Sequence, residues 1–311
     1  MNSRARASVL AFSALALLAC AGCAASAQPP PPLSSDAAIA AAERAELPRD
    51  WADWNHAFAP FNVIGDIYYV GPRGIGIYLI TTPAGHILLD GGFAQSAPQV
   101  EANIQALGFR VSDIKFLLNT HAHIDHAGGL ARLKRDSGAM MLASAGDAPA
   151  LEAGRVSAGP TAEMPYPAVR VDRIMGDGES VRLGGVTLTA HMTPGHTPGC
   201  TSWTMTTRDA SGAARSVFFT CSETVAGQSL APESYPGVVE AYRATFARVA
   251  TMQADVFLGP HGNFFDLEGK RARQLAGDAN AFVDPTELQR FNVEMQRQFE
   301  QELARQQAAR R

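Results

Sequence analysis

The segment that most constrains this chain lies at residues 120–129, with the sequence Thr-His-Ala-His-Ile-Asp-His-Ala-Gly-Gly. Three imidazoles and one carboxylate fall within six residues of it: His121, His123, Asp125 and His126. The apolar run before it, residues 114–119, predicts a buried strand, and residues 129–135 predict a helix. Clustered histidines repel one another when protonated and lose solvation when buried, unless a metal ion compensates. The cluster therefore predicts a metal site on a strand-to-helix loop.

The spacing within this cluster indicates two metal ions. Six residues are too few and too close for every donor to reach one tetrahedral ion. We therefore expect the first two histidines to serve one ion, and the aspartate with the third histidine to serve the other. Ligands from elsewhere must complete both sites. Two further histidines, His196 and His261, lie in Gly- and Pro-rich loops after predicted strands, which is where loop ligands are expected.

Apolar runs separated by turn residues predict a chain in which strands and helices alternate. Strands are predicted at residues 67–70, 75–81, 86–90, 114–119, 139–144, 170–174, 186–192, 201–207, 216–220 and 256–259. Helices are predicted at residues 97–107, 129–135, 238–252 and 285–311, the last with an apolar stripe of Leu288, Phe291, Met295 and Phe299. Two mixed sheets packed face to face with helices outside would bury these runs. The predicted fold class is α/β, a four-layer αββα sandwich within residues 51–311.

Length and charge narrow the class of partner. The chain has 311 residues, of which 46% are hydrophobic, so it can bury a substantial core. Its formal net charge of −4 gives no basic footprint, which argues against a nucleic-acid partner. A small-molecule partner and a monomeric state are expected.

Residues 1–27 are typical of an export signal. Two arginines precede an apolar stretch over residues 9–18, and small residues lead up to Ala27. The apolar stretch is too short to span a bilayer, so no membrane insertion is expected after signal removal. A Pro-rich linker is predicted at residues 28–50. Export to the periplasm is expected, with lipoprotein anchoring at Cys20 as the alternative.

Cleavage after Ala27 would leave two of the four cysteines, Cys200 and Cys221. In an oxidising compartment two remaining cysteines are expected to be paired. Closing a loop of about twenty residues is worth about 3 kcal/mol in the chain-entropy description. We therefore predict a disulfide between them.

The metal motif resembles that of the metallo-β-lactamase superfamily, His-x-His-x-Asp-His followed by two distant histidines. The resemblance implies one zinc ion held by His121, His123 and His196 and a second held by Asp125, His126 and His261. These donors suit zinc and also iron or manganese. In the same resemblance Asp90 corresponds to an acid that orients a zinc-bound imidazole, with a turn-forming Asp-Gly pair as the alternative. Because the superfamily also holds thioesterases, lactonases, nucleases and sulfatases, the motif alone names no substrate.

A second segment, residues 219–227, narrows the resemblance. Many of these hydrolases carry a metal-bridging aspartate in a Thr-Gly-Asp segment, and here Ser222 takes its place. A hydroxyl is a poor bridging ligand, so Ser222 is free to bind a substrate carboxylate, which is the pattern of subclass B3 metallo-β-lactamases. Thr224 would supply a second hydroxyl or be an ordinary strand residue. Glu223 departs from the subclass pattern, in which this residue is usually neutral. A shift of one residue in register would make Glu223 a metal ligand and favour another hydrolase.

The resemblance to subclass B3 runs from Trp51 to about residue 282. It implies a β-lactamase that hydrolyses β-lactam antibiotics, carbapenems included, and so confers resistance. The nucleophile would be a zinc-bound hydroxide oriented by Asp125, while Ser222 holds the substrate carboxylate. The alternatives are a lactonase acting on acyl-homoserine lactones and a non-catalytic zinc-storage protein. Storage would not require two asymmetric sites with an aspartate beside them.

The histidines outside the metal cluster and one long loop are also interpreted from the sequence. His56 and His86 lie outside the cluster and are expected to be structural. His191 precedes the His196 loop and is expected to be an ordinary partly buried residue, with a role beside a metal ligand as the alternative. The loop at residues 154–167 either borders the active site or is a solvated connector.

Overall fold

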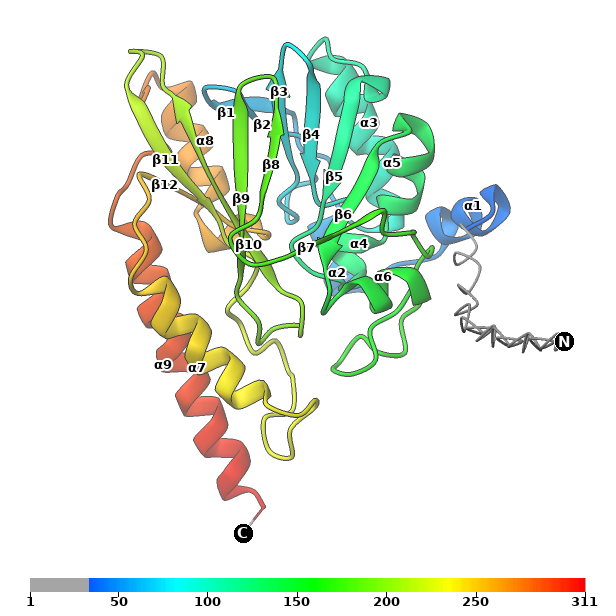
Figure 1. Ribbon diagram of the computed structural model, residues 1–311, viewed down its shortest axis with the longest axis vertical. Helices are drawn as coiled ribbons and strands as arrows, with labels where there is room; N and C mark the ends of the chain where they lie inside the picture. The colour runs from blue at the N-terminus through cyan, green and yellow to red at the C-terminus, as the bar shows by residue number, and fades with distance from the viewer. Residues whose placement is uncertain (1–33, 311) are drawn as a thin grey trace, which may run out of the picture. The chain divides into compact units, whose positions relative to one another are not determined.

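The computed structural model of the chain describes residues 34–310 (Figure 1). The predicted export signal at residues 1–27 and the alternative lipid attachment at Cys20 lie outside the described residues. Within the described part, no helix is both long and apolar enough to cross a membrane.

The strands form two sheets. The seven-stranded sheet has the order β1 to β7: β1 (Phe61–Ile64), β2 (Ile67–Tyr69), β3 (Tyr78–Thr82), β4 (Gly85–Leu89), β5 (Ile114–Leu118), β6 (Met140–Ser144) and β7 (Arg173–Met175). Its strands are antiparallel from β1 to β4 and parallel from β4 to β7. The five-stranded sheet has the order β12, β11, β10, β9, β8: β8 (Ser180–Leu183), β9 (Val186–Met192), β10 (Thr201–Arg208), β11 (Ala214–Phe219) and β12 (Val256–Leu258).

Helices cover the outer faces of both sheets, as Figure 1 shows. The α-helices are α1 (Asp36–Arg44), α2 (Arg49–Trp54), α3 (Ala97–Ala106), α4 (Ile124–Ala127), α5 (Leu130–Ser137), α6 (Ala148–Ala153), α7 (Val238–Val249), α8 (Leu267–Leu275) and α9 (Glu287–Ala308). Helices α3 and α5 lie against the seven-stranded sheet, while α7, α8 and α9 contribute Val249, Leu267 and Leu288 to the core of the five-stranded sheet. The predicted four-layer αββα sandwich is confirmed.

Strand β3 shows why two sheets and two helical layers form. Successive side chains of a strand point to opposite faces. Ile80 therefore joins the core shared with the second sheet, together with Trp203, while Leu79 joins the core under α3 and contacts the cluster of Val100 and Ile104. Because both faces of the central strands are apolar, each face requires a covering layer.

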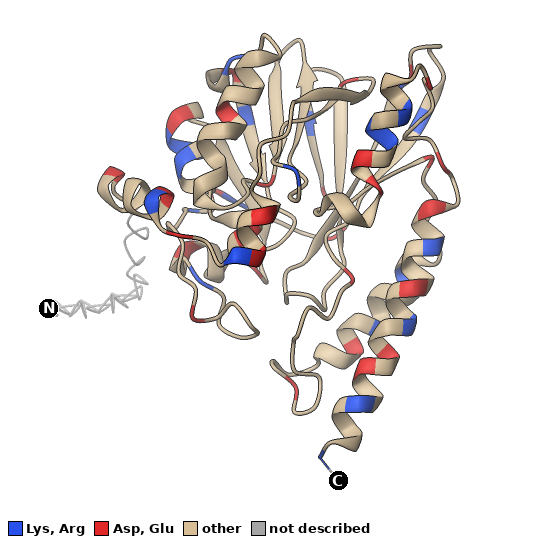
Figure 2. Ribbon diagram, turned by 180° about the vertical axis from the view of Figure 1, so that it is seen from behind, with Lys and Arg blue, Asp and Glu red and all other residues tan. Residues whose placement is uncertain are grey.

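The last helix extends past the sheets as a pair with α7. A separate apolar cluster joins the two helices, with Tyr242 and Phe246 from α7 and Phe299 and Leu303 from α9. The apolar stripe predicted for α9 is confirmed at its first and last positions, both fully buried. Acidic and basic residues alternate along α9 (Figure 2), and many pair within the helix, as Arg297 does with Glu294.

All ten predicted strands are present, but β1 and β8 and the helices α1, α2, α4, α6 and α8 were not predicted. The strand predicted at residues 75–81 begins only at Tyr78, because the residues before it turn toward the loop at His261: Gly76 N donates to Pro260 O, and Ile75 pairs with His261. Helix α1 lies inside the segment expected to be a linker. It is capped by Ser35, and Ile39 is buried in the core.

Candidate metal centre

The histidine cluster lies where β5 ends, and Asp90 holds it there. Asp90 follows β4 with φ +66, a left-handed conformation that aspartate tolerates better than most residues. Its Oδ1 accepts hydrogen bonds from Asn119 Nδ2 (3.0 Å) and Thr120 N (2.7 Å), and its Oδ2 accepts from Thr120 Oγ1 (2.6 Å). The neighbouring parallel strands β4 and β5 thus place their carboxyl ends side by side, and the Asp90 carboxylate fixes the start of the loop.

Asp90 also lies beside the imidazoles. Its Oδ2 is 3.3 Å from Nδ1 of His126, and Thr120 Oγ1 is 3.0 Å from Nδ1 of His121. In both rings Nδ1 faces Asp90 and Thr120, which leaves Nε2 to face the other ligand atoms. The predicted role of Asp90 in orienting an imidazole remains a prediction, and this geometry is what it requires.

The first group of ligand atoms comes from His121, His123 and His196, whose ligand atoms all lie within 4.8 Å of one another. Nδ1 of His123 is 3.0 Å from Nε2 of His196. His196 enters from the loop between β9 and β10 and is oriented by the carbonyl of Thr224, 2.8 Å from its Nδ1. The structure therefore brings together all three residues expected to hold the first ion.

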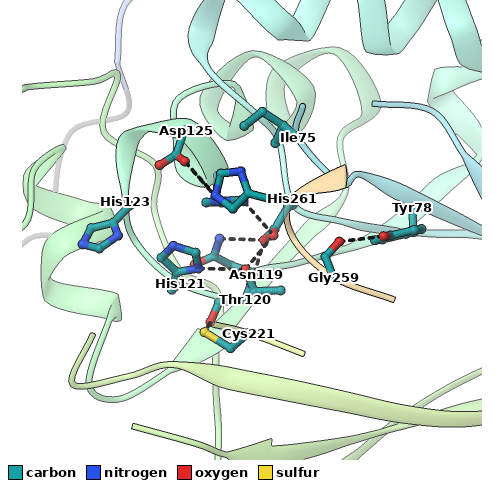
Figure 3. Close-up of polar contacts among 12 residues, drawn as sticks. Ile75, Tyr78, Asn119, Thr120, His121, His123, Asp125, Cys221, Gly259 and His261 are labelled. Atoms are coloured by element: carbon teal, nitrogen blue, oxygen red, sulfur yellow. Dashed lines mark hydrogen bonds and ion pairs between the residues drawn. The ribbon is translucent and has the colours of Figure 1, made fainter. Parts of the chain in front are cut away.

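The second group adjoins the first through His121. His121, Asp125 and His126 also lie within 4.8 Å of one another, and the rings of His121 and His126 are 4.3 Å apart. His261 completes this side, with Nε2 lying 3.3 Å from Nε2 of His126 and 3.4 Å from Oδ2 of Asp125. The side chains of Asp125 and His261 face each other in Figure 3. The residues expected to hold the second ion are also assembled.

His261 is positioned by the N-terminal part of the domain. Its Nδ1 is 3.1 Å from the carbonyl of Gly74, and Gly74 N in turn donates to Trp54 O. The Trp54 ring packs edge-on against His261 at 4.9 Å. A Cβ at Gly74 would lie 2.5 Å from Cα of Trp54, so only glycine allows this approach. Sequence reasoning gave Trp54 no such role.

Burial keeps most of these imidazoles neutral. Desolvation, helped by neighbouring imidazoles, holds the pKa of His121 well below its ordinary value. Burial likewise lowers the pKa of His123 to about 3, and that of His196 and of His261 to about 4. A neutral imidazole offers the lone pair that a metal ion needs.

Asp125 and His126 form the charged pair of the site. Burial opposes both charges, but the mutual attraction of the two groups outweighs it. The pKa of Asp125 falls well below its ordinary value, and the Asp125 and Asp90 carboxylates raise the pKa of His126 to about 10.

A metal ion fits this donor set. Among residues 34–310, Nε2 of His121 is buried and has no hydrogen-bond partner. Five imidazoles, four of them neutral, converge with one ionised carboxylate, and the ring nitrogens of two pairs, His123 with His196 and His126 with His261, are only 3.0 and 3.3 Å apart. A metal ion would accept the lone pairs of nitrogen atoms held this close together. Nitrogen and carboxylate donors in groups of three match zinc. The donor set therefore supports a metal-binding site.

Asp147 joins the two ligand loops, and the sequence gave no indication of this. Its Oδ2 accepts from Ala122 N (2.9 Å) and Thr197 Oγ1 (2.8 Å), and its Oδ1 accepts from Gly199 N (2.9 Å). Burial raises the pKa of this carboxyl to about 6, although all three hydrogen bonds oppose the shift. A buried aspartate after β6 is a signal of an internal hydrogen-bond role, but only the fold identifies its partners.

The segment that follows β11 brings Ser222 and Thr224 together. Their hydroxyl oxygens are 3.1 Å apart. The backbone of Thr224 is fixed by His196 and by Tyr242 Oη, which donates to its carbonyl at 2.7 Å. The predicted disulfide is confirmed: Cys200 and Cys221 are bonded, with Cα atoms 5.7 Å apart, and join the start of β10 to the residue before Ser222.

Glu223 belongs to neither group of clustered ligand atoms. Its only hydrogen bond runs from Thr220 Oγ1 to Oε1 at 3.4 Å, and within residues 34–310 its Oε2 has no partner. Burial raises the pKa of Glu223 to about 8. The alternative in which Glu223 becomes a metal ligand receives no support from this geometry.

A cavity of about 550 Å³ opens beside the first ligand group. Its lining includes His123 and His196, the loop residues Arg155 and Glu163, and Gln228 and Tyr235 from the opposite wall. The loop at residues 154–167 therefore borders the site. His191, by contrast, contacts Thr204 Oγ1 (2.8 Å) on the five-stranded sheet and is an ordinary half-buried residue, as expected.

Comparisons with known proteins identify the family of the chain. The family profile described as Metallo-beta-lactamase superfamily matches residues 70–261. The crystal structure of a subclass B3 metallo-beta-lactamase of Bradyrhizobium japonicum is 45% identical, covers 83% of this chain and 98% of its own, and gives a TM-score of 0.80. The structure of a native metallo-beta-lactamase from Legionella gormanii is 36% identical, covers 81% of this chain and 98% of its own, and gives a TM-score of 0.78.

Curated relatives are more distant. A probable metallo-hydrolase of Burkholderia pseudomallei (strain 1710b) is 34% identical over 39% of this chain. The match spans 40% of that relative's own length. Hydroxyacylglutathione hydrolases and N-acyl homoserine lactonases also match over parts of this chain.

Proposed function

The chain belongs to the metallo-beta-lactamase superfamily, and from this we propose that it is a zinc-dependent β-lactamase that hydrolyses the amide of β-lactam antibiotics, carbapenems included. The observation that carries the proposal is Ser222. In the place where a metal-bridging aspartate would stand, this chain has a hydroxyl paired with that of Thr224. A pair of neutral donors suits a substrate carboxylate, which β-lactams carry beside the reacting amide.

The chain's own residues would act as follows. Five imidazoles and one carboxylate would hold two zinc ions, the first through His121, His123 and His196 and the second through Asp125, His126 and His261, with His126 giving up its proton when zinc binds. Zinc bound there would polarise the lactam carbonyl and provide hydroxide from water at neutral pH. The Asp125 carboxylate, which stays ionised, accepts a hydrogen bond from the attacking water and orients it. Ser222 and Thr224 donate to the substrate carboxylate, and the cavity receives the side chain of the antibiotic.

The proposal extends to the setting of the enzyme. Export by residues 1–27, a domain at residues 51–311 and a periplasmic monomer would place the activity where β-lactams reach their targets. Hydrolysis there would confer resistance. The Cys200–Cys221 disulfide suits such an oxidising compartment.

The decisive experiment is hydrolysis of a chromogenic cephalosporin and a carbapenem by purified residues 28–311, with added zinc and then with excess chelator. We expect turnover of both that the chelator abolishes, with two zinc ions per chain by elemental analysis. No turnover despite two bound zinc ions would favour the lactonase alternative, which an acyl-homoserine lactone substrate would then test.

Replacing Asp125 tests the assignment of roles. We expect Asp125→Ala to lower kcat by about 10²- to 10⁴-fold, because both a ligand and the group that orients the water are lost. Zinc content is measured alongside, and Asp209→Ala in the β10–β11 turn is the control. A near-native rate for Asp125→Ala would contradict the proposed role.

A further inference from the structure

The cavity that is lined by the loop residues Arg155 and Glu163 is also lined by Gln228, and the segment at residues 225–231 that carries Gln228 is named the wall. Within this wall Gln228 is almost fully buried and lines the cavity together with His196. Its Nε2 donates to the carbonyl of His196 at 3.3 Å, and its backbone N donates to Val225 O at 2.9 Å. The wall therefore touches a ligand residue directly.

Gln306, near the end of the C-terminal helix, holds this wall through three hydrogen bonds. Its Oε1 accepts from Leu230 N (2.7 Å) and Ala231 N (3.0 Å), and its Nε2 donates to Gln228 O (3.0 Å). These are backbone groups of a segment without regular secondary structure, more than 70 residues away in the chain. Within residues 34–310, no other side chain accepts a hydrogen bond from the N–H groups of Leu230 and Ala231.

Apolar packing supports the same contact. Leu303, one turn before Gln306, is buried in one cluster with Leu230 and Val239. Helix α9 is itself fixed to the body of the domain: Asn292 Nδ2 donates to Phe246 O at 3.2 Å, and Gln289 Nε2 donates to Met252 O at 2.6 Å. A rigid helix thus reaches from the outer layer of the sandwich to the wall of the cleft.

We propose that Gln306 is a positioning residue for the reaction: from the C-terminal helix it fixes residues 228–231, and so sets the shape of the wall that receives the variable side chain of the antibiotic. The inference rests on the proposed function for the identity of the substrate, but the contact between Gln306 and residues 228–231 is independent of that function. Gln306 does not touch the cavity, so it acts through Gln228.

The first test compares two substitutions of adjacent glutamines on α9. Gln306→Met keeps the length and helix propensity of the side chain but removes the three hydrogen bonds to the wall, together with the one that Nε2 donates to Glu302 Oε1 within the helix (2.8 Å). Gln307→Met changes an exposed residue of the same helix. Amide hydrogen exchange of residues 225–235 is measured on the zinc-loaded protein. We expect exchange at Leu230 and Ala231 to accelerate about tenfold in Gln306→Met and to remain unchanged in Gln307→Met. Equal exchange in both variants would overturn the proposal.

The second test is kinetic. For a cephalosporin with bulky side chains we expect Gln306→Met to raise KM about three- to tenfold while kcat stays within about twofold, because the wall is loosened but the metal ligands are kept. A carbapenem with a small side chain should show a smaller rise. A change confined to kcat, or equal KM values for wild type and variant, would overturn the role in the reaction. If the wild type hydrolysed no β-lactam, the proposed function would fail, while the exchange measurement would still decide whether Gln306 holds the wall.

Discussion

Buried carboxyl groups accept different numbers of hydrogen bonds on the two sides of the active site. On the metal side, Asp90 and Asp147 each accept three hydrogen bonds from the chain. On the substrate side, Glu223 has one long hydrogen bond from Thr220, and its second oxygen has no partner within residues 34–310. Local contacts thus fix the metal side, whereas Glu223 on the substrate side lacks such partners, and the wall at residues 225–231 is held by Gln306 of the C-terminal helix.

This difference has a physical origin. A metal centre needs several ligands within tenths of an ångström, so each ligand loop requires fixed hydrogen bonds behind it. A wall that contacts variable substrate side chains needs only an approximate shape. Unsatisfied polar groups tend to persist where function requires them or where the fold can tolerate their cost. Three substitutions test how far the comparison holds.

The largest expected effect is on stability, and it concerns Glu223. Its pKa is raised by burial to about 8 from the ordinary 4.5, so the folded protein holds a proton that the unfolded chain releases. Stability contributed by this proton is fully present below about pH 4.5 and is lost as pH rises through about 8. Each pKa unit corresponds to about 1.4 kcal/mol. We therefore expect Glu223→Gln to be more stable than wild type by a few kcal/mol at pH 8, and by much less at pH 5.

Urea unfolding of the chelated protein between pH 5 and pH 8.5 measures this difference. Glu163→Gln, in the exposed part of the loop at residues 154–167, is the matched control because its carboxyl is solvated in both states. A stability difference that is the same at every pH would show that Glu223 is ionised in the fold, and the contrast between the two sides would then be lost.

How much of the site could be predicted follows the same division. The cluster from His121 to His126 is contiguous, and His196 and His261 lie in recognisable Gly- and Pro-rich loops, so the ligands could be predicted from the sequence alone. The orientation of Glu223 could not, because a shift of one residue decides whether it faces the metal or the core. Asp147 and Gln306 have no sequence signal, since the loops that they hold lie 25 to 78 residues away in the chain.

The fold shows a similar limit. Strand β9 was predicted to the residue, because apolar and polar residues alternate along it between turn residues, which is the period of a strand. Helix α1 was not, because its segment follows a Pro-rich run and was interpreted as part of a linker, and Ile39 is the only residue of this helix that is buried. Helix α8 is mostly polar and buries Leu267 and Lys270 only, so its place is set by tertiary contacts.

An intermediate effect is expected at Asp147. Asp147→Asn replaces an acceptor of three hydrogen bonds by an amide that must turn an N–H toward one of the donors. The loops that carry His121 and His196 then lose their common anchor, and we expect zinc affinity to fall about 10- to 100-fold. Competition with a chromophoric chelator measures it. Asp209→Asn is the matched control, since Asp209 is also heavily hydrogen-bonded but lies in the β10–β11 turn. An equal loss in both variants would attribute the effect to general destabilisation.

The smallest effect is expected at Ser222, and it tests the substrate side directly. Ser222→Ala removes one of two hydroxyl donors, so KM should rise about tenfold, the value of one hydrogen bond to a charged group, with kcat changed little. Thr224→Val and the double variant complete a cycle, and coupling between them is expected because the two hydroxyls are 3.1 Å apart. A substrate whose carboxylate is esterified provides the sharpest comparison: if Ser222 binds the carboxylate, the ester should bind wild type and Ser222→Ala equally well. An equal loss for acid and ester would assign Ser222 to the fold of the wall instead of to the substrate.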